Sequence, residues 1–353
     1  MALRTIPTKQ SLFLSILLLL SFTLQTSGNQ ENENISECGP ATSSCYNKSK
    51  ALHLKIIAFA TILIASMIGV CLPLLTRSIP FLQPDRDLFV VVKAFASGVI
   101  LATGYMHVLP DSFDCLRSPC LPENPWKKFP FTTFVAMLSA LVTLMIDSFA
   151  MSYHKKHSMG PTIRNAEVNR INSNSDDQNK PLRVKGDEEA DSQLLRYRVV
   201  AQVLELGIVV HSVIIGLSLG ASMNPCTIGP LIAALCFHQL FEGMGLGGCI
   251  LQAEYDNKMK AIMVFFFSAT TPFGILLGIG LSNVYSDNSP TALIVVGILN
   301  GSSAGLLNYM ALVDLLASDF MGPKLQNSVK LQIWAYIAVL LGAGGMSLMA
   351  KWA

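Results

Sequence analysis

The residues of this chain best suited to binding a metal ion stand inside two of its most apolar stretches. His211 and Ser212 lie in "VVHSVIIGLSLGAS", and His238, Gln239 and Glu242 lie in "FHQLFEGMGLGG". Two imidazoles, one carboxylate and a few neutral oxygens suit Zn²⁺, Fe²⁺ or Mn²⁺ better than Ca²⁺ or Cu⁺. His238 and Glu242 are four residues apart, so on a helix they share one face. Ser212 and Gln239 would point away from it, toward a second ligand shell or a second ion.

These stretches belong to a chain of which 51% is hydrophobic and 14% charged. The apolar residues form long runs, as in transmembrane helices of about 20 residues. With the N-terminal tail outside, both histidines and Glu242 fall near the membrane midplane, where ionisable groups are costly and are candidates for function. The alternative is a histidine that only hydrogen-bonds a neighbouring helix. The expected fold is all-α and polytopic, with eight spans at 52–75, 88–110, 131–151, 199–220, 229–251, 261–283, 291–317 and 331–350.

The polar segments divide the chain into regions. Residues 1–28 are typical of a cleaved secretory signal, with a membrane anchor as the alternative. Asn34 and Asn47 stand in glycosylation sequons, and Cys38 and Cys45 fit an oxidising compartment. The segment between the third and fourth spans is polar and poor in aromatic residues, as in a linker. The predicted regions are 1–28 signal, 29–51 outer tail, 52–151 helices one to three, 152–198 cytoplasmic loop and 199–353 helices four to eight.

The outer end of the second span carries "HVLPDSFD", which contains His107, Asp111 and Asp114. A cluster of this kind at the water boundary concentrates cations, so we expect a vestibule through which metal ions approach. Ordinary solvation of a helix end is the alternative. Cys115 and Cys120 follow on the same side, and they are candidates for a small disulfide loop.

Glycine and repeat patterns indicate how the helices are organised. Glycines at three- and four-residue spacing allow close helix packing, or sliding of one bundle past another. The second span contains "GYMHVLPD" and the seventh contains "NYMALVD". This similarity indicates an inverted repeat that relates helices one to three with helices six to eight.

The motifs "HSVIIGLSLGAS", "HQLFEGMGLGGCILQAEY", "GYMHVLPDSF" and "ENPWKKFPF" resemble those of the ZRT/IRT-like (ZIP) metal transporters, especially the plant zinc- and iron-regulated branch. The resemblance implies a ZIP-type bundle that moves divalent metal into the cytoplasm by an elevator-like shift. It also implies a metal centre of His211, Ser212, His238, Gln239 and Glu242, with the metal as cargo and no cofactor. Bacterial relatives often have an acid where this chain has Ile215, which favours one transported ion per cycle.

Three functions fit these residues: a transporter for Zn²⁺ and Fe²⁺, with Mn²⁺ and Cd²⁺ as further cargo, an intramembrane metallo-hydrolase, or a metal sensor without transport. An enzyme is not expected, because a hydrolase would need a separate general base. The net charge of +2 gives no basic footprint for nucleic acid. Divalent metal ions and the lipid bilayer are the expected partners, with a homodimer as a further candidate. The plasma membrane is the expected location, with an endomembrane as the alternative.

Overall fold

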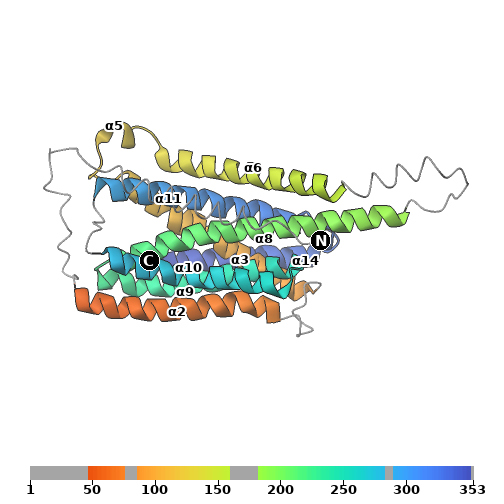
Figure 1. Ribbon diagram of the computed structural model, residues 1–353, viewed down its shortest axis with the longest axis horizontal. Coiled ribbons are helices and arrows are strands. Elements are labelled where there is room, and N and C mark those ends of the chain that lie inside the picture. The colour runs from red at the N-terminus through yellow and green to blue at the C-terminus, as the bar shows by residue number, and fades with distance from the viewer. Residues whose placement is uncertain (1–46, 76–85, 160–181, 283–288, 351–353) are drawn as a thin grey trace, which may run out of the picture.

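The computed structural model describes residues 47–75, 86–159, 182–282 and 289–350 (Figure 1). Within these ranges the regular structure is helical, and eight helical segments are long and apolar enough to cross a membrane. The predicted all-α fold with eight spans is therefore confirmed, and the chain is an integral, multi-pass membrane protein. The eight segments are Lys48–Leu75, Asp87–Leu116, Phe131–Ser152, Gln193–Ala221, Pro225–Gln252, Asn257–Leu281, Pro290–Phe320 and Val329–Ala350.

Two of the spans contain π-helical turns, η3 and η4, which insert an extra residue into the helical repeat and occur frequently at functional sites. η3 carries the "YMH" sequence and η4 begins within "YMALVD", so the two similar motifs share an unusual backbone. In chain order the elements are α2 (Lys48–Leu75), α3 (Asp87–Ala102), η3 (Thr103–Val108), α4 (Leu109–Leu116), α5 (Glu123–Trp126), α6 (Phe131–Met159), α8 (Leu182–Ala221), α9 (Pro225–Gln252), α10 (Asn257–Leu281), α11 (Pro290–Tyr309), η4 (Met310–Ala317), α12 (Ser318–Phe320), α13 (Pro323–Gln326) and α14 (Val329–Ala350).

Helix extends further into the segment 152–198 than its linker composition indicates. α6 ends at Met159 and α8 begins at Leu182. α8 has 40 residues, twice the length that a membrane span requires. Its first part is rich in Leu, Arg, Glu and Ala, which favour helix over coil. α8 therefore extends past the ends of the neighbouring helices, as its long ribbon in Figure 1 shows.

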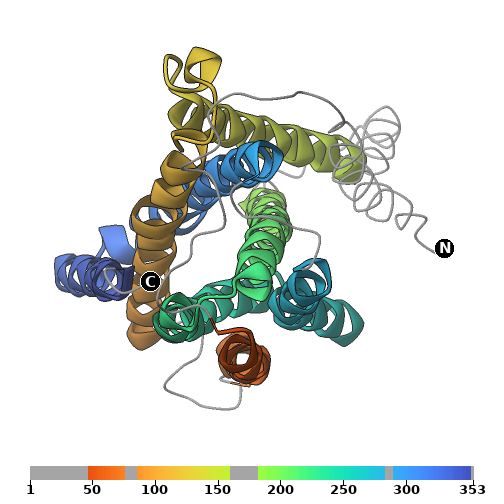
Figure 2. The same cartoon turned by 90° about the vertical axis from the view of Figure 1, so that its left-hand side faces the viewer.

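The spans pack as two groups of helices, which Figure 2 shows nearly end-on. We call them the α9 group (α2, α8, α9 and α10) and the α3 group (α3, η3, α4, α6, α11, η4, α12, α13 and α14). In the first, α2 packs on α9 and α10, and α8 packs on α10. In the second, α3 packs on α14, and α11 packs on α6 and α4. The two groups meet mainly where α9 faces α3 and where α8 faces α11 and α6.

Glycines within each group bring helix backbones together. A Cβ added at Gly278 of α10 would lie 2.3 Å from the carbonyl oxygen of Leu217 on α8. A Cβ at Gly98 of α3 would lie 2.2 Å from the carbonyl oxygen of Val339 on α14. Between the groups, an added Cβ meets side-chain ends instead of backbone. A Cβ added at Gly245 of α9, for example, would lie 3.1 Å from Ile100 Cδ1 on α3. The sequence left two interpretations of these glycines, close helix packing and sliding of one bundle past another. Inside each group, close packing is the one observed.

A hydrogen-bonded turn joins α9 to α10. Arg198 Nε donates to the carbonyl oxygen of Ala253 at 3.0 Å, and Tyr255 Oη donates to the carbonyl oxygen of Arg198 at 2.8 Å. Gln202 Nε2 donates to Tyr255 Oη at 2.8 Å. Burial raises the pKa of Tyr255 to about 12, so the phenol stays protonated at physiological pH. These bonds tie α8 to the end of α9 within one group.

The expected disulfide between Cys115 and Cys120 is not formed. Cys120 is disulfide-bonded, but Cys115 remains a thiol. Cys115 lies in the last turn of α4 and faces α11, where a Cβ added at Gly297 would approach its Cβ to 3.0 Å. Cys226, at the start of α9, is also disulfide-bonded, which we did not expect. The predicted signal, Asn34, Cys38 and Cys45 lie outside the described residues.

Candidate metal site

Two adjacent helices bring three of the predicted ligands together. His211 projects from α8, and His238 and Glu242 project from consecutive turns of α9. One ligand atom from each residue lies within 4.8 Å of the others, which is close enough for all three to bind a single metal ion. The ring centroids of His211 and His238 are 5.8 Å apart. His238 and Glu242 share one face of α9, as their four-residue spacing on a helix predicts.

These ligands are buried without hydrogen-bond partners. At most 1% of His211, His238 and Glu242 is exposed. Both nitrogens of each histidine and both carboxylate oxygens lack a partner among the described residues. A buried polar atom without a partner costs about 1–3 kcal/mol, and more when it is charged. A divalent cation would satisfy one nitrogen of each histidine and the carboxylate of Glu242 at once. Helix–helix hydrogen bonding, the alternative for a buried histidine, is not observed for these atoms within the described chain.

Ser212, Gln239 and Thr271 form a neutral polar cluster beside the three ligands. All three are buried, and Thr271 on α10 donates to Gln239 Oε1 at 3.5 Å. Ser212 Oγ and Gln239 Nε2 have no partner in the described part of the chain. These groups are therefore placed to support the ligands or to bind a water molecule, but they bring no charge to the site.

His107 lies deeper than the sequence indicates. We expected it at the water boundary, but it is 5% exposed and its ring centroid lies 6.0 Å from that of His238. The π-helical η3 explains the difference, since its wider turn changes which side chains face inward. Asp111, one turn further out, is half-buried, and Asp114 is exposed. Burial thus increases from Asp114 through Asp111 to His107, and His107 approaches the ligands from the α3 group.

Ile215 occupies the position of the missing acid. It is 8% exposed and belongs to an apolar cluster with Ile62, Leu235 and Ile275. This environment would not solvate a second divalent ion. The burial of Ile215 therefore agrees with the expectation of one ion per site.

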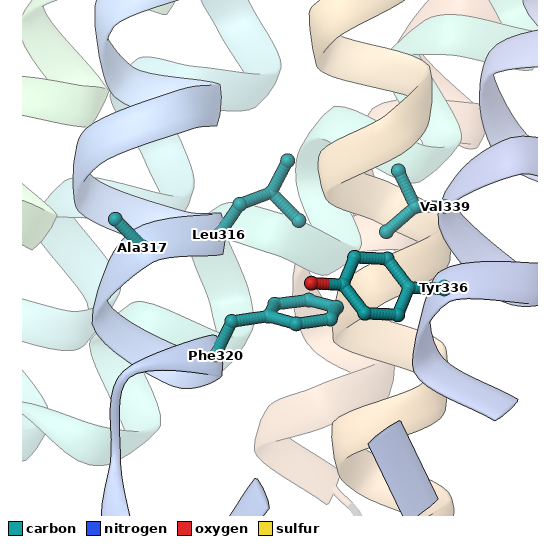
Figure 3. Close-up of a pocket in the computed structure, with 5 residues that line it drawn as sticks. All are labelled: Leu316, Ala317, Phe320, Tyr336 and Val339. Carbon is teal, nitrogen blue, oxygen red and sulfur yellow. The ribbon is translucent and has the colours of Figure 1, made fainter. Parts of the chain in front are cut away.

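Two other features lie away from the ligands. Asn47, in the described sequon, is exposed, and its Oδ1 accepts a hydrogen bond from the backbone N–H of Lys50 at 2.9 Å; its glycosylation stays a prediction. A pocket of about 190 Å³ lies between η4, α12 and α14, where the rings of Phe320 and Tyr336 meet (Figure 3). Apolar side chains make up most of its wall, so it does not offer a metal site. Its lining residues are Leu316, Ala317, Phe320, Tyr336 and Val339.

Asp314 and Lys93 are among the buried charged residues that were not predicted from the sequence. Asp314 in η4 is 3% exposed, and its Oδ2 has no hydrogen-bond partner among the described residues. Lys93 in α3 is 5% exposed. Both stand in apolar spans, so the rule that ionisable residues in membranes are functional candidates would have found them.

Comparison of the sequence with known protein families identifies the family to which this chain belongs. Residues 52–350 match the family model described as ZIP zinc transporter. The chain belongs to the ZIP family. Its predicted resemblance to these transporters is therefore confirmed over nearly the whole membrane part, and ZIP proteins transport divalent metal ions.

Individual ZIP relatives are similar along most of their length. "Fe(2+) transport protein 1" of Arabidopsis thaliana is 60% identical over 340 residues, covering 96% of each chain. "Zinc transporter 7" of Arabidopsis thaliana is 58% identical over 354 residues, also covering 96% of each chain. "Fe(2+) transport protein 1" of Oryza sativa subsp. japonica is 60% identical over 328 residues, covering 89% of this chain and 87% of the relative. Iron and zinc transporters are thus similar to this chain to nearly the same extent.

Proposed function

We propose that this ZIP protein carries Zn²⁺ and Fe²⁺ into the cytoplasm, with Mn²⁺ and Cd²⁺ as further cargo. The observation that carries the proposal is the convergence of His211, His238 and Glu242 within 4.8 Å, all buried and without hydrogen-bond partners in the described chain. Imidazole and carboxylate ligands suit these metals. Relatives named for iron and for zinc support both as cargo.

The cation approaches along a path of increasing burial. Asp114 and Asp111 attract it at the outer surface, because carboxylates at or near the surface raise the local concentration of cations. His107 accepts it next and passes it to His238, whose ring lies 6.0 Å away. Ser212 and Gln239, buried and next to the histidines in the sequence, are further candidate ligands for the ion. The ion then binds His211, His238 and Glu242, and the apolar surroundings of Ile215 limit the site to one ion.

Release to the inner side requires the site to move relative to its surroundings. The three ligands stand on α8 and α9 of the α9 group, whereas His107 stands on the α3 group. Backbone contacts make each group rigid, and side-chain ends fill the interface between them. We infer that the α9 group shifts as a unit against the α3 group, which parts His238 from His107 and opens the site inward.

The other functions fit less well. A hydrolase would need an open coordination position and a general base near the metal. Glu242 is the carboxylate in the described group of ligands, and in our proposal it binds the metal, so it does not serve as the general base. We therefore propose a transporter without a resident cofactor, located in the plasma membrane and surrounded by lipid. A second copy of the chain stays a candidate partner.

Metal uptake into cells tests the function. The chain is expressed in a cell that lacks its own zinc and iron uptake, and accumulation of each metal is measured. We expect uptake with wild type and its loss with His238→Ala, while surface expression is unchanged. His53→Ala is the matched control. His53 is exposed at the start of α2, far from the three ligands, so this variant should transport normally. Equal accumulation by wild type and His238→Ala would disprove the proposal.

A further inference from the structure

Lys93 is a buried cation at the inner end of the bundle, away from the metal ligands. It lies in the second turn of α3, and its side chain is 4% exposed. Its Nζ donates to Asp319 Oδ1 at 3.0 Å and to Gln252 Oε1 at 3.0 Å. A buried charge of this kind is tolerated only when it is paired and hydrogen-bonded. Asp319 supplies the pairing charge, so the bond to Gln252 is not needed for neutralisation.

The two acceptors belong to different helix groups. Asp319 stands on α12, in the same group as Lys93. Gln252 is the last residue of α9, the helix that carries His238 and Glu242. The bond from Lys93 to Gln252 therefore joins the inner end of the ligand-bearing helix to the α3 group.

This bond differs from the other contacts between α9 and α3. Gly245 and Gly248 of α9 face the side-chain ends of Ile100 and Phe89, which can slide or rotate. A hydrogen bond to an ammonium group is directional and stronger than a neutral one. Any shift of α9 along α3 must break it or move Lys93 away from Asp319.

We propose that Lys93 is a positioning residue that latches α9 to the α3 group through Gln252, and that this latch opens in each transport cycle. The proposal deepens the transport function above and rests on it. Lys93 keeps its partner Asp319 when the latch opens, so no unpaired charge is left in the membrane. Gln252 meets the inner aqueous side at that moment and is solvated there.

A native thiol reports on the latch. Cys249 lies one turn before Gln252 on α9 and is 2% exposed, so a maleimide reagent reaches it only when the groups separate. The full-length protein is placed in lipid nanodiscs, and the alkylation of Cys249 is followed by peptide mass spectrometry with Cys236 as internal reference. Gln252→Leu removes the acceptor without changing charge, and we expect Cys249 to react about tenfold faster. An unchanged rate would overturn the latch.

The matched control keeps the latch and removes a different bond. Gln202→Leu deletes the hydrogen bond from Gln202 to Tyr255, which lies within the α9 group. Alkylation of Cys249 should stay within about twofold of wild type. An acceleration equal to that of Gln252→Leu would show that any loosening of α9 exposes Cys249, and this would overturn the specific role of Lys93.

A strengthened latch gives the opposite change. Gln252→Glu replaces the neutral amide acceptor of the Lys93 ammonium group with a second carboxylate, so a charge-assisted hydrogen bond becomes an ion pair at the same place. We expect the flux of metal into liposomes to slow about fivefold or more, while the equilibrium affinity for Zn²⁺ stays unchanged. A general loss of structure would not produce this combination. Unchanged flux would disprove an opening step, and this result decides the proposal even if Gln252→Leu fails to fold. Absence of flux in wild type would instead contradict the transport function, and the alkylation of Cys249 would still test the latch.

Discussion

Glu242 is the residue on which the proposed metal site depends most, because it provides the carboxylate in the group of three candidate ligands. Its two oxygens are buried and lack hydrogen-bond partners in the described chain. Charge neutralisation of a divalent ion in apolar surroundings must come from this side chain, since His211 and His238 bind metals as neutral imidazoles. The histidines supply geometry and preference for transition metals, and Glu242 supplies the attraction.

The number of ions per chain follows from these side chains. The wild-type protein should bind about one Zn²⁺ at the buried site, and Glu242→Gln should weaken this binding by more than about 100-fold, since even indirect partners of metal ligands contribute 10–100-fold. Metal analysis after equilibrium dialysis gives both values. Ser212 and Gln239 add no charge, so two ions of similar affinity per site would contradict the single-ion account.

In the proposed path, Asp111 acts on the approach of the metal rather than on its final binding. Asp111→Asn should raise the KM for Zn²⁺ uptake about threefold to tenfold, with Vmax retained, because a half-buried carboxylate concentrates cations near the path. The control is Glu123→Gln, an exposed acid of α5 on the same side of the membrane. A fall in Vmax at unchanged KM would place Asp111 in the transport step and not in the approach.

At the scale of helices, close backbone contacts make the two groups rigid and leave their interface adaptable. Gly278 of α10 meets the backbone of α8, whereas Gly280, half a turn further, has no atom within 4 Å of an added Cβ. Within each group the helices are therefore locked by shape. Between the groups, side chains such as Met310, which faces Gly207, can change rotamer during a shift.

This contrast predicts opposite effects of two alanines on one helix. Gly278→Ala should destabilise the protein by about 2 kcal/mol or more, because overpacking forces α8 and α10 apart. Gly280→Ala should be neutral or stabilising by up to about 1 kcal/mol, since alanine favours helix. Thermal unfolding of the protein in detergent micelles measures both. Equal midpoints for the two variants would show that the α8–α10 contact does not depend on the glycine.

Sequence patterns predict elements better than they predict the contacts between them. The apolar runs indicate all eight spans, and the spacing of His238 and Glu242 places them on one face. The position of His107 could not be predicted, because no pattern of hydrophobic residues in the sequence marks the π turn of η3. The pairing of Lys93 with Asp319 joins residues 226 positions apart. The extension of α8 was missed because its polar residues resemble a linker, although they also favour helix.

For the whole molecule, the arrangement explains how a membrane protein holds a cation and still releases it. The ligands belong to one helix group, while His107 and the approach acids belong to the other. In the proposed cycle, relative movement of the groups would change what the site faces without disturbing His211, His238 and Glu242. Membership of the ZIP family, which matches residues 52–350, agrees with a transport function.

The most direct test of this account is metal flux in a system that contains only the purified protein and lipid. Liposomes with the full-length chain and an internal zinc-sensitive dye receive Zn²⁺ outside, and the initial rate of dye response is recorded. We predict a saturable signal for wild type that falls to the rate of empty liposomes with Glu242→Gln, while His53→Ala retains it. Saturable flux that survives in Glu242→Gln would contradict transport through the His211, His238 and Glu242 site.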